Sequence, residues 1–340
     1  MEKQIEMKRS GNLYEKIAEP DNLRLAFWKA TKGKRSRPEV IEYRQSLDIN
    51  LQNLREQLLN KRWNIGNYHF FTVHDPKERT ICAAAFPERV LHHAIMNICE
   101  PNLEKYAIYD SYACRTKKGS HKAILRAQIF SRRFPWYLKL DIRKYFDSID
   151  HKVLLRLLER RFKDHDLFDL FAAILATYET LPCKGLPIGN LVSQHFANFY
   201  LGNLDHWVKE KLRFTGYVRY MDDFVLWGAD RHELRSALAE IECYLQYQLS
   251  LVLKDNIQLN RCVRGMPFLG YRIFPRIIRL SPRSKRRFVA HLTEYEQRYL
   301  SGEWSEASLQ RHMQPVTAFA SFANSDALRR DTISRYGKVA

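Results

Sequence analysis

The chain has 340 residues, of which 56 are Lys or Arg and 38 are Asp or Glu, so its formal net charge is +18. Hydrophobic residues make up 45% and aromatic residues 13%, which excludes a disordered tail and allows a sizeable core. So large a positive charge favours a polyanionic partner, either nucleic acid or an anionic membrane surface, over a merely basic globular protein.

The sequence argues against both membrane insertion and export. The longest apolar run, at 170–176, is far shorter than the roughly 20 residues that a spanning helix needs, and the first ten residues contain no apolar signal core. The six cysteines are scattered without a C-x-x-C pair, which argues against a zinc finger or a disulfide framework. We therefore expect a soluble, cytoplasmic protein with no membrane contact.

The first half of the chain mixes predicted helices and strands without an internal repeat. Leucines at helical spacing predict a helix around 47–58, and 68–74 predicts a strand followed by a turn at Asp75-Pro76. The further elements predicted here are a basic loop at 29–37, a helix from about Glu88, a buried strand at 136–142, a helix capped by Asp150 and a helix at 166–178.

The second half continues in the same mixed manner. Residues 217–227 alternate like two short strands around a polar tip. The other predicted elements are a loop at 185–189, a long helix from there to about 213, a helix at 231–249, a hairpin at 268–274 and 277–280, a basic helix beginning at Ser281-Pro282, and mostly helix to the C-terminus. Because regular βαβ alternation is absent, the predicted class is α+β, with a sheet backed by helices.

Two adjacent carboxylates, Asp222 and Asp223, occupy the polar tip at 217–227. Like charges repel and partial burial removes their hydration, so the pair is costly unless a divalent cation offsets both effects. Asp141 ends the strand 136–142, and the three carboxylates converge if these strands lie side by side in one antiparallel sheet. Such a cluster suits two Mg²⁺ ions about 3.5–4 Å apart, with Mn²⁺ as a substitute. The alternative is an ordinary β-turn, because Asp is common in turns.

The tetrapeptide Tyr220-Met221-Asp222-Asp223 matches the Y-x-D-D signature of reverse transcriptases, and other blocks resemble that family in order over about 65–300. These blocks are 79–81 with 89–93, 111–115 with 117–119, 140–142 with 145–149, 185–194 and 268–271. The resemblance implies a right-hand polymerase fold. Its predicted regions are an N-terminal extension and basic arm at 1–64, fingers at 65–135, a palm at 136–280 with a fingers insertion near 180–195, and a helical thumb at 281–340.

The block at 188–194 departs from the commonest family form. Most reverse transcriptases carry Q-G-x-x-x-S-P there, whereas this chain reads I-G-N-L-V-S-Q. That form resembles the reverse transcriptases of diversity-generating retroelements, and the absence of a maturase or endonuclease extension after the thumb is expected for them. The resemblance implies an RNA-directed DNA polymerase of a bacterial cell, host- or phage-encoded. It would copy a template-repeat RNA into cDNA, with errors at template adenines, in mutagenic retrohoming.

The resemblance also implies roles for individual residues at the catalytic centre. Asp141 and Asp222 would bridge the two metal ions, the Ile142 carbonyl would add a ligand, and Asp223 would assist the ion at the primer end. Phe146 lies where the family keeps a bulky ring that excludes a ribose 2′-hydroxyl, with a core phenylalanine as the alternative.

The resemblance also implies a second group of residues, which would bind the incoming dNTP. These nucleotide-binding residues are Lys77, Arg79, Phe146, Ile188 and Gln194, with a plain surface role left open for Lys77. Ile188 replaces the usual glutamine and cannot make its side-chain hydrogen bond, so we hypothesise that it loosens base selection. A core-packing role for Ile188 is the alternative.

Basic residues supply the predicted contacts with the template and the cDNA–primer duplex. Eight Lys or Arg against two Glu occupy 272–298, which suits a sequence-independent grip on phosphates, although a solvated charged face explains any single lysine. The residues assigned to template or primer are Arg115, Lys117, Lys118, Gly270, Tyr271, Arg283, Lys285, Arg286 and Arg287.

The resemblance implies one protein partner, the pentameric accessory variability determinant. Two other functions stay open: another short bacterial reverse transcriptase, from a retron or a defence system, and a non-catalytic RNA-binding scaffold. Ser193-Gln194 favours a diversity-generating retroelement over a retron or a defence system. The presence of all three acids argues against a non-catalytic scaffold.

Overall fold

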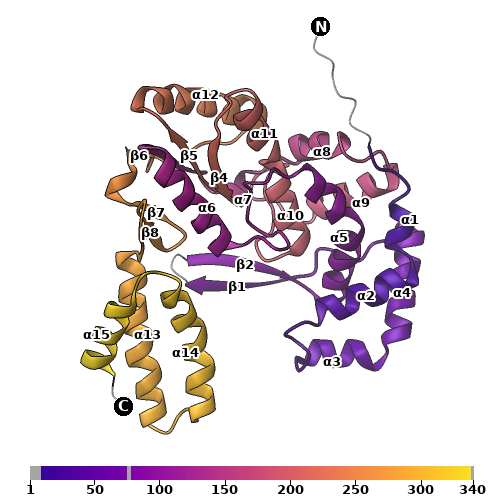
Figure 1. The fold of residues 1–340 in the computed structure, drawn as a ribbon. Helices are drawn as coiled ribbons and strands as arrows, with labels where there is room; N and C mark the ends of the chain where they lie inside the picture. The colour runs from indigo at the N-terminus through magenta and orange to yellow at the C-terminus, as the bar shows by residue number, and fades with distance from the viewer. Residues whose placement is uncertain (1–8, 75–77, 338–340) are drawn as a thin grey trace. The chain divides into compact units, whose positions relative to one another are not determined.

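The computed structural model describes residues 9–74 and 78–337. The chain divides into two compact units, each assembled from three separate stretches of sequence (Figure 1). The first unit comprises residues up to 109, 142–207 and 240–254, and the second comprises 110–141, 208–239 and the residues from 255 onward. The four functional regions predicted from the resemblance have other boundaries, and they stay a prediction.

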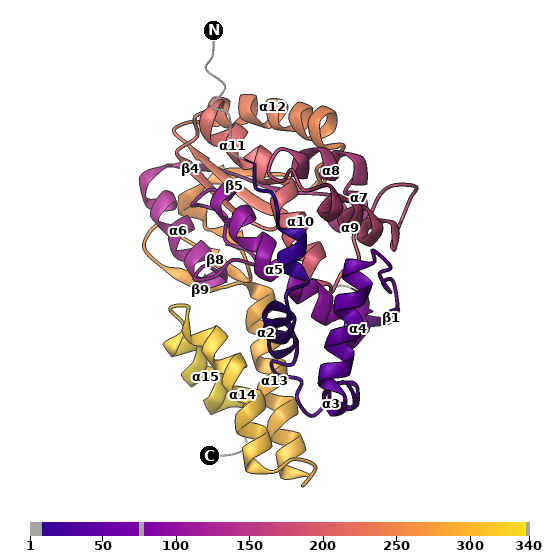
Figure 2. The same cartoon turned by 90° about the vertical axis from the view of Figure 1, so that its right-hand side faces the viewer.

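The first unit is mainly helical. Helix α2 packs against both α4 and α5, and Figure 2 shows α2 next to α4. Its elements are α1 (Tyr14–Ile17), α2 (Pro20–Ala30), α3 (Pro38–Gln45), α4 (Leu47–Leu59), β1 (Tyr68–His74), β2 (Glu78–Ala84), α5 (Phe86–Tyr106), α7 (Tyr145–Ser148), α8 (His151–Glu159), α9 (His165–Ala176) and α10 (Leu191–Tyr200). Two helices, α11 (Gly202–Glu210) and α12 (Arg231–Leu249), begin in one unit and end in the other.

Burial of apolar side chains explains why these helices form. In α5, Leu91, Ala94 and Ile95 recur at helical spacing and are buried, while Pro87 in the first turn matches the φ angle of a helix start. In α8, the carboxylate of Asp150 accepts a 3.1 Å hydrogen bond from the Val153 N–H, so the predicted cap is confirmed.

An antiparallel sheet forms the centre of the second unit. Its strand order is β4-β5-β3-β6, and helix α6 (Ser120–Arg133) packs against β4. The strands are β3 (Trp136–Asp141), β4 (Gly216–Tyr220), β5 (Asp223–Gly228) and β6 (Gln258–Arg261). The inner strands β3 and β5 carry side chains that are mostly buried, including Leu138 and Leu226. The hairpin predicted at 217–227 is thereby confirmed.

A smaller sheet and three helices complete the second unit. The sheet has the order β7-β8-β9, and helix α13 packs against both α14 and α15 (Figure 1). These elements are β7 (Met266–Phe268), β8 (Tyr271–Ile273), β9 (Ile278–Leu280), α13 (Pro282–Leu300), α14 (Glu306–Ser321) and α15 (Asp326–Tyr336). The Ser281 hydroxyl caps α13 by accepting from the Ser284 N–H at 3.1 Å, so this predicted helix start is confirmed.

Two predicted elements differ from those observed. The long helix expected to reach residue 213 is two helices, because α10 ends at Tyr200 and Gly202 begins α11 in close contact with the Tyr106 ring. The strand expected at 268–274 is interrupted by a turn at Leu269 and Gly270, which have φ angles of 48° and 86°. The turn divides the expected strand into β7 and β8, and β8 pairs with both β7 and β9.

The mixed α+β class is confirmed, and so is a C-terminal region that is mostly helical. In the ranges that the structure describes, no helix combines the length and the apolar character needed to cross a bilayer.

Candidate catalytic site

The three predicted carboxylates all belong to the second unit, and strand pairing brings two of them face to face. In the antiparallel register, Asp141 of β3 lies opposite Asp223 of β5, and Tyr220 of β4 also pairs with Asp223. Met221 and Asp222 form the connecting turn, with Met221 in the left-handed region at φ 56°. Directly opposed residues in such a sheet have Cβ atoms about 4.5–5.5 Å apart, so the carboxylates of Asp141 and Asp223 are close neighbours.

The electrostatics of this cluster centre on Asp223, whose side chain is only 23% exposed. The pKa of Asp223 is raised to about 6, chiefly because burial disfavours its charged form. The negative charges of Asp141 and Asp222 raise it further. The Lys139 ammonium, with Nζ 2.8 Å from Asp223 Oδ1, acts in the opposite direction. One lysine therefore offsets only part of the negative charge gathered at this end of the sheet.

The donor chemistry of these residues is the kind that a divalent cation such as Mg²⁺ requires. Three carboxylates supply the hard oxygen ligands that Mg²⁺ prefers, and a second positive charge would relieve the repulsion that raises the Asp223 pKa. Ile142, whose carbonyl was predicted as a further ligand, directly follows Asp141 and is buried in the first unit, where it pairs with Leu253.

The predicted nucleotide-binding residues that the structure describes are in the first unit, where a loop connects two of them through hydrogen bonds. The Leu186 N–H donates to the Phe146 carbonyl at 2.8 Å, and the Cys82 N–H of β2 donates to the Ile188 carbonyl at 2.8 Å. Loop 185–190 is therefore held against both the α7 turn and strand β2. Gly189 makes the close approach feasible, because it has a φ of 116° and a Cβ there would lie 2.8 Å from Ile81 Cγ2.

The other residues predicted to bind the nucleotide are not part of this hydrogen-bonded loop. Arg79 is exposed on β2, opposite Val73 of β1. Gln194 is half-buried in α10, and its N–H donates to the Asn190 carbonyl one turn earlier. Lys77 lies outside the described residues.

The predicted template-binding residues of the fingers stretch rest on one short segment of the second unit. Arg115 Nη1 donates to the Ser111 carbonyl at 2.7 Å, and Lys118 Nζ lies 5.0 Å from the centre of the Tyr112 ring. Lys117 is exposed in the following turn with a φ of 61°. The segment 111–118 therefore carries three cationic side chains, and a side-chain hydrogen bond holds one of them, Arg115, against its backbone.

The two residues of the predicted primer-binding hairpin differ in exposure. Tyr271 is buried, with its hydroxyl donating to the Phe319 carbonyl at 2.8 Å and its ring in contact with the rings of Phe319 and Phe322. This side chain joins the small sheet to the C-terminal helices and offers no surface to a primer. Gly270 is exposed, and its carbonyl accepts from the Ser284 hydroxyl.

Four predicted duplex-binding cations lie in the first two turns of α13. These exposed residues are Arg283, Lys285, Arg286 and Arg287. The N-terminal end of a helix carries a partial positive charge and favours acids, yet the first turn of α13 contains none. Helix stability therefore does not account for these cations, and their contact with a duplex stays a prediction.

Two residues close to the three carboxylates in the sheet register were not identified from sequence alone. Lys139 stands two residues before Asp141 in a strand whose side chains alternate, so both point to the same face, and a diagonal neighbour of Asp223 could have been inferred. Arg219 is 1% exposed in β4, and its Nη1 donates to the Met221 carbonyl at 2.9 Å. An arginine in a strand that is otherwise apolar was the available signal.

Comparison with known proteins adds a family match. The family described as "Reverse transcriptase (RNA-dependent DNA polymerase)" matches residues 74–273. Protein YkfC of Escherichia coli is 25% identical over 308 residues, which cover 73% of this chain and 79% of YkfC. The group II intron-encoded protein LtrA of Lactococcus lactis is 27% identical over 150 residues, covering 41% of this chain and 24% of LtrA.

Solved structures show a weaker likeness. Apo telomerase from Candida tropicalis aligns with a TM-score of 0.49 and 10% identity, covering 81% of this chain and 60% of that one. Telomerase from Candida albicans, in complex with a fragment of telomeric RNA, aligns with a TM-score of 0.45 and 11% identity, covering 79% of this chain and 55% of that one.

Proposed function

Because the chain belongs to the reverse transcriptase family and is thus an RNA-directed DNA polymerase, we propose that Asp141, Asp222 and Asp223 hold its two catalytic Mg²⁺ ions. The observation that carries this proposal is the register that sets Asp141 opposite Asp223, beside the turn that contains Asp222. When bound, such ions lower the pKa of the attacking primer hydroxyl and neutralise charge on the triphosphate.

Further residues are proposed to act on the reactants, each described within its own unit. Lys139 keeps one carboxylate oxygen of Asp223 paired, which orients the other oxygen. In the first unit, the Phe146 ring would exclude a ribose 2′-hydroxyl and the exposed Arg79 guanidinium would pair with the triphosphate. The cations of α13 would hold the template–primer duplex by its phosphates.

Primer extension on an RNA template with dNTPs and Mg²⁺ tests the catalytic assignment. We expect Asp222→Asn combined with Asp223→Asn to lower the rate on the order of a thousandfold or more, because charge neutralisation at the metal removes several kcal/mol of transition-state stabilisation. The matched control is Asp230→Asn, an exposed cap of α12 that asparagine can replace. Equal rates for the double variant and the control would contradict the proposal.

We further propose that the enzyme acts in a diversity-generating retroelement, copying a template-repeat RNA with errors at adenines and working with a pentameric accessory protein. The support is the sequence from Ile188 to Gln194, which begins in a loop fixed against β2 by the bond from the Cys82 N–H to the Ile188 carbonyl and continues into α10. Because Ile188 is held through its backbone, its side chain can be exchanged without releasing the loop.

The substitution Ile188→Gln tests the finer proposal. A side-chain amide at this position restores a hydrogen-bonding group for the nucleotide, so we expect misincorporation opposite template adenine to fall several-fold while incorporation opposite the other three bases changes little. Ile188→Leu is the matched control, since it keeps an apolar side chain of the same volume. An unchanged error rate at adenine would refute the role of Ile188.

A further inference from the structure

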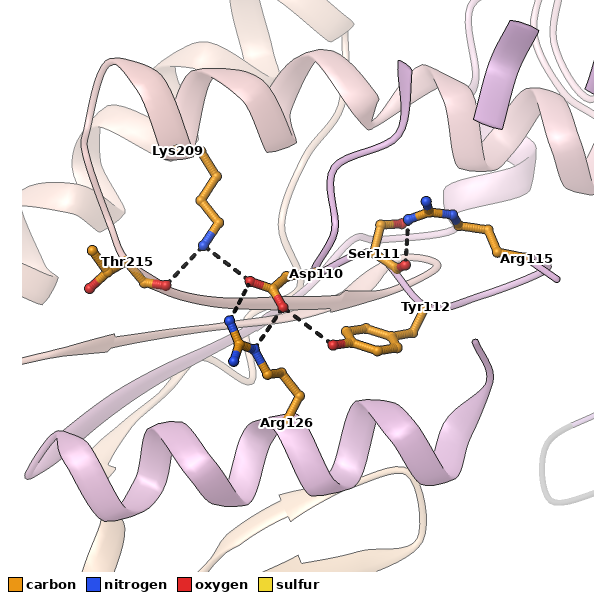
Figure 3. Close-up of polar contacts among 7 residues, drawn as sticks. All are labelled: Asp110, Ser111, Tyr112, Arg115, Arg126, Lys209 and Thr215. Carbon is orange, nitrogen blue, oxygen red and sulfur yellow. Dashed lines mark hydrogen bonds and ion pairs between the residues drawn. The ribbon is translucent and has the colours of Figure 1, made fainter. Parts of the chain in front are cut away.

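Asp110 is a buried carboxylate of the second unit that the proposed chemistry does not use. It is 3% exposed and accepts hydrogen bonds from three side chains (Figure 3). Arg126 donates from Nε at 2.8 Å and Nη2 at 3.4 Å, Lys209 Nζ lies at 3.3 Å, and the Tyr112 hydroxyl lies at 3.3 Å. Two cations and a hydroxyl thus converge on one acid from α6, from the end of α11 and from the adjoining segment.

The backbone at Asp110 is joined to strand β4. The Arg219 N–H donates to the Asp110 carbonyl at 2.9 Å, and the Tyr112 N–H donates to the Arg219 carbonyl at 3.0 Å. Ser111 thereby pairs with Arg219 in a parallel bridge. Since β4 is the outermost strand in the order β4-β5-β3-β6, residues 110–112 extend the sheet by a short additional edge.

Strand β4 leads directly into the turn that carries the catalytic carboxylates. Tyr220 follows Arg219, and Met221 and Asp222 form the turn. The buried Arg219 guanidinium also donates to the Met221 carbonyl at 2.9 Å, which fixes the residue that has the left-handed φ angle. Arg219 therefore connects the edge that Asp110 anchors to Met221, the residue next to Asp222.

The same edge supports the predicted template contacts. Arg115 donates to the Ser111 carbonyl, Lys118 lies over the Tyr112 ring, and the Gly119 N–H donates to the Tyr112 carbonyl at 3.0 Å. One hydrogen-bonded segment thus lies between the catalytic turn and the cations on the template side.

We propose that Asp110 is a positioning residue that holds this edge so that the turn containing Asp222 keeps the geometry needed to bind metal. The inference rests on the proposed function, because it assumes that Asp222 and Asp223 are metal ligands. A buried acid that is shared by two cations has one well-defined arrangement, whereas an unanchored edge strand has freedom to shift. Displacements of about 1 Å cost an enzyme up to a hundredfold in rate.

Two substitutions test this role. Asp110→Asn keeps the shape and removes the charge, and Lys209→Met removes one donor whose side chain is already 24% exposed, so folding of this variant is expected. We expect Asp110→Asn to lower kcat roughly tenfold or more, and Lys209→Met to lower it a few-fold, with the KM for dNTP nearly unchanged. The effects should be non-additive in the double variant.

A direct metal titration separates positioning from simple loss of stability. Mn²⁺ binding to the protein without nucleic acid, followed by electron paramagnetic resonance, should weaken several-fold in both variants. Ser325→Ala serves as the control, because it removes a buried hydrogen bond to the Ala320 carbonyl in the same unit and takes no part in the contacts of Asp110. It should lower the free energy of unfolding without changing Mn²⁺ affinity.

The outcomes can be told apart. If Asp110→Asn and Lys209→Met leave both Mn²⁺ affinity and kcat at the level of the control, or if Asp110→Asn fails to fold and Lys209→Met alone behaves like the control, the positioning role is wrong. If Asp222→Asn combined with Asp223→Asn also leaves Mn²⁺ affinity unchanged, the proposed metal site fails instead.

Discussion

Two antiparallel hairpins in this molecule have the same pairing geometry and opposite environments. The hairpin of β1 and β2 in the first unit is exposed along most of its length, with Phe70 at 54% and Phe71 and Val73 also open to solvent. The hairpin of β4 and β5 in the second unit is buried almost throughout, and only the residues at its turn reach the surface.

The burial of each hairpin determines what its side chains can do. A strand pair that is packed on its faces fixes the charges at its tip within a few tenths of an ångström, as two opposed carboxylates require. A hairpin that buries little contributes little to stability, and its side chains are available to a partner. We therefore expect β4–β5 variants to act through stability and metal geometry, and β1–β2 variants to act through binding.

The largest expected difference is in core stability. Leu226→Ala in β5 leaves a cavity at a fully buried position and should lower the free energy of unfolding by about 3 kcal/mol. Phe70→Ser in β1 should change it by less than about 0.5 kcal/mol, because the ring is already exposed. Urea denaturation of both variants measures the contrast, and equal losses would show that the exposed hairpin packs in solution.

The next effect concerns the ion pair between Lys139 and Asp223. Lys139→Met leaves the half-buried Asp223 without its cation and should cost about 2 kcal/mol of unfolding free energy in the absence of divalent ions. Millimolar Mg²⁺ should recover much of this loss, because a bound cation takes over the compensation. Thermal unfolding with and without Mg²⁺ provides the measurement, with the exposed Lys152→Met as control. A loss that Mg²⁺ does not change would separate Lys139 from the metal site.

A smaller effect is expected for the charge carried by the exposed hairpin. Arg79→Met should raise the KM for dNTP about tenfold, which corresponds to about 1.4 kcal/mol, and leave the free energy of unfolding unchanged. Steady-state primer extension over a range of dNTP concentrations gives KM and kcat separately. A fall in stability, or a kcat effect without a KM effect, would mean that Arg79 has a structural role.

Features that depend on neighbouring residues could be predicted from the sequence, and features that depend on distant residues could not. The helix cap at Asp150, the strand at β1 and the hairpin around Asp222 depend on neighbours within a few residues, and all three were predicted. The opposition of Asp141 and Asp223 needed one added assumption, that the two strands pair. The burial of Tyr271 could not be foreseen, because it depends on Phe319, which lies 48 residues later in the chain.

The same limit applies to Asp110 and the residues that surround it. Its partners Arg126 and Lys209 are 16 and 99 residues away, and no local motif signals that they share one carboxylate. Charged residues far apart in sequence are ordinarily assigned to the surface, so buried ion pairs are the features that sequence patterns miss.

The smallest expected effect tests a third kind of surface, the cations at the start of α13. Arg286→Gln combined with Arg287→Gln should weaken binding of an RNA·DNA duplex a few-fold at low salt and reduce the slope of log affinity against log salt by about 2, since each phosphate contact contributes about one released counterion. Arg330→Gln combined with Arg335→Gln on α15 is the matched control, because it removes the same charge from another helix of the second unit. If both pairs reduce the slope equally, the duplex responds to the net charge of +18 as a whole. A reduction confined to the α13 pair would instead assign that charge a direction, with α13 as the contacting face.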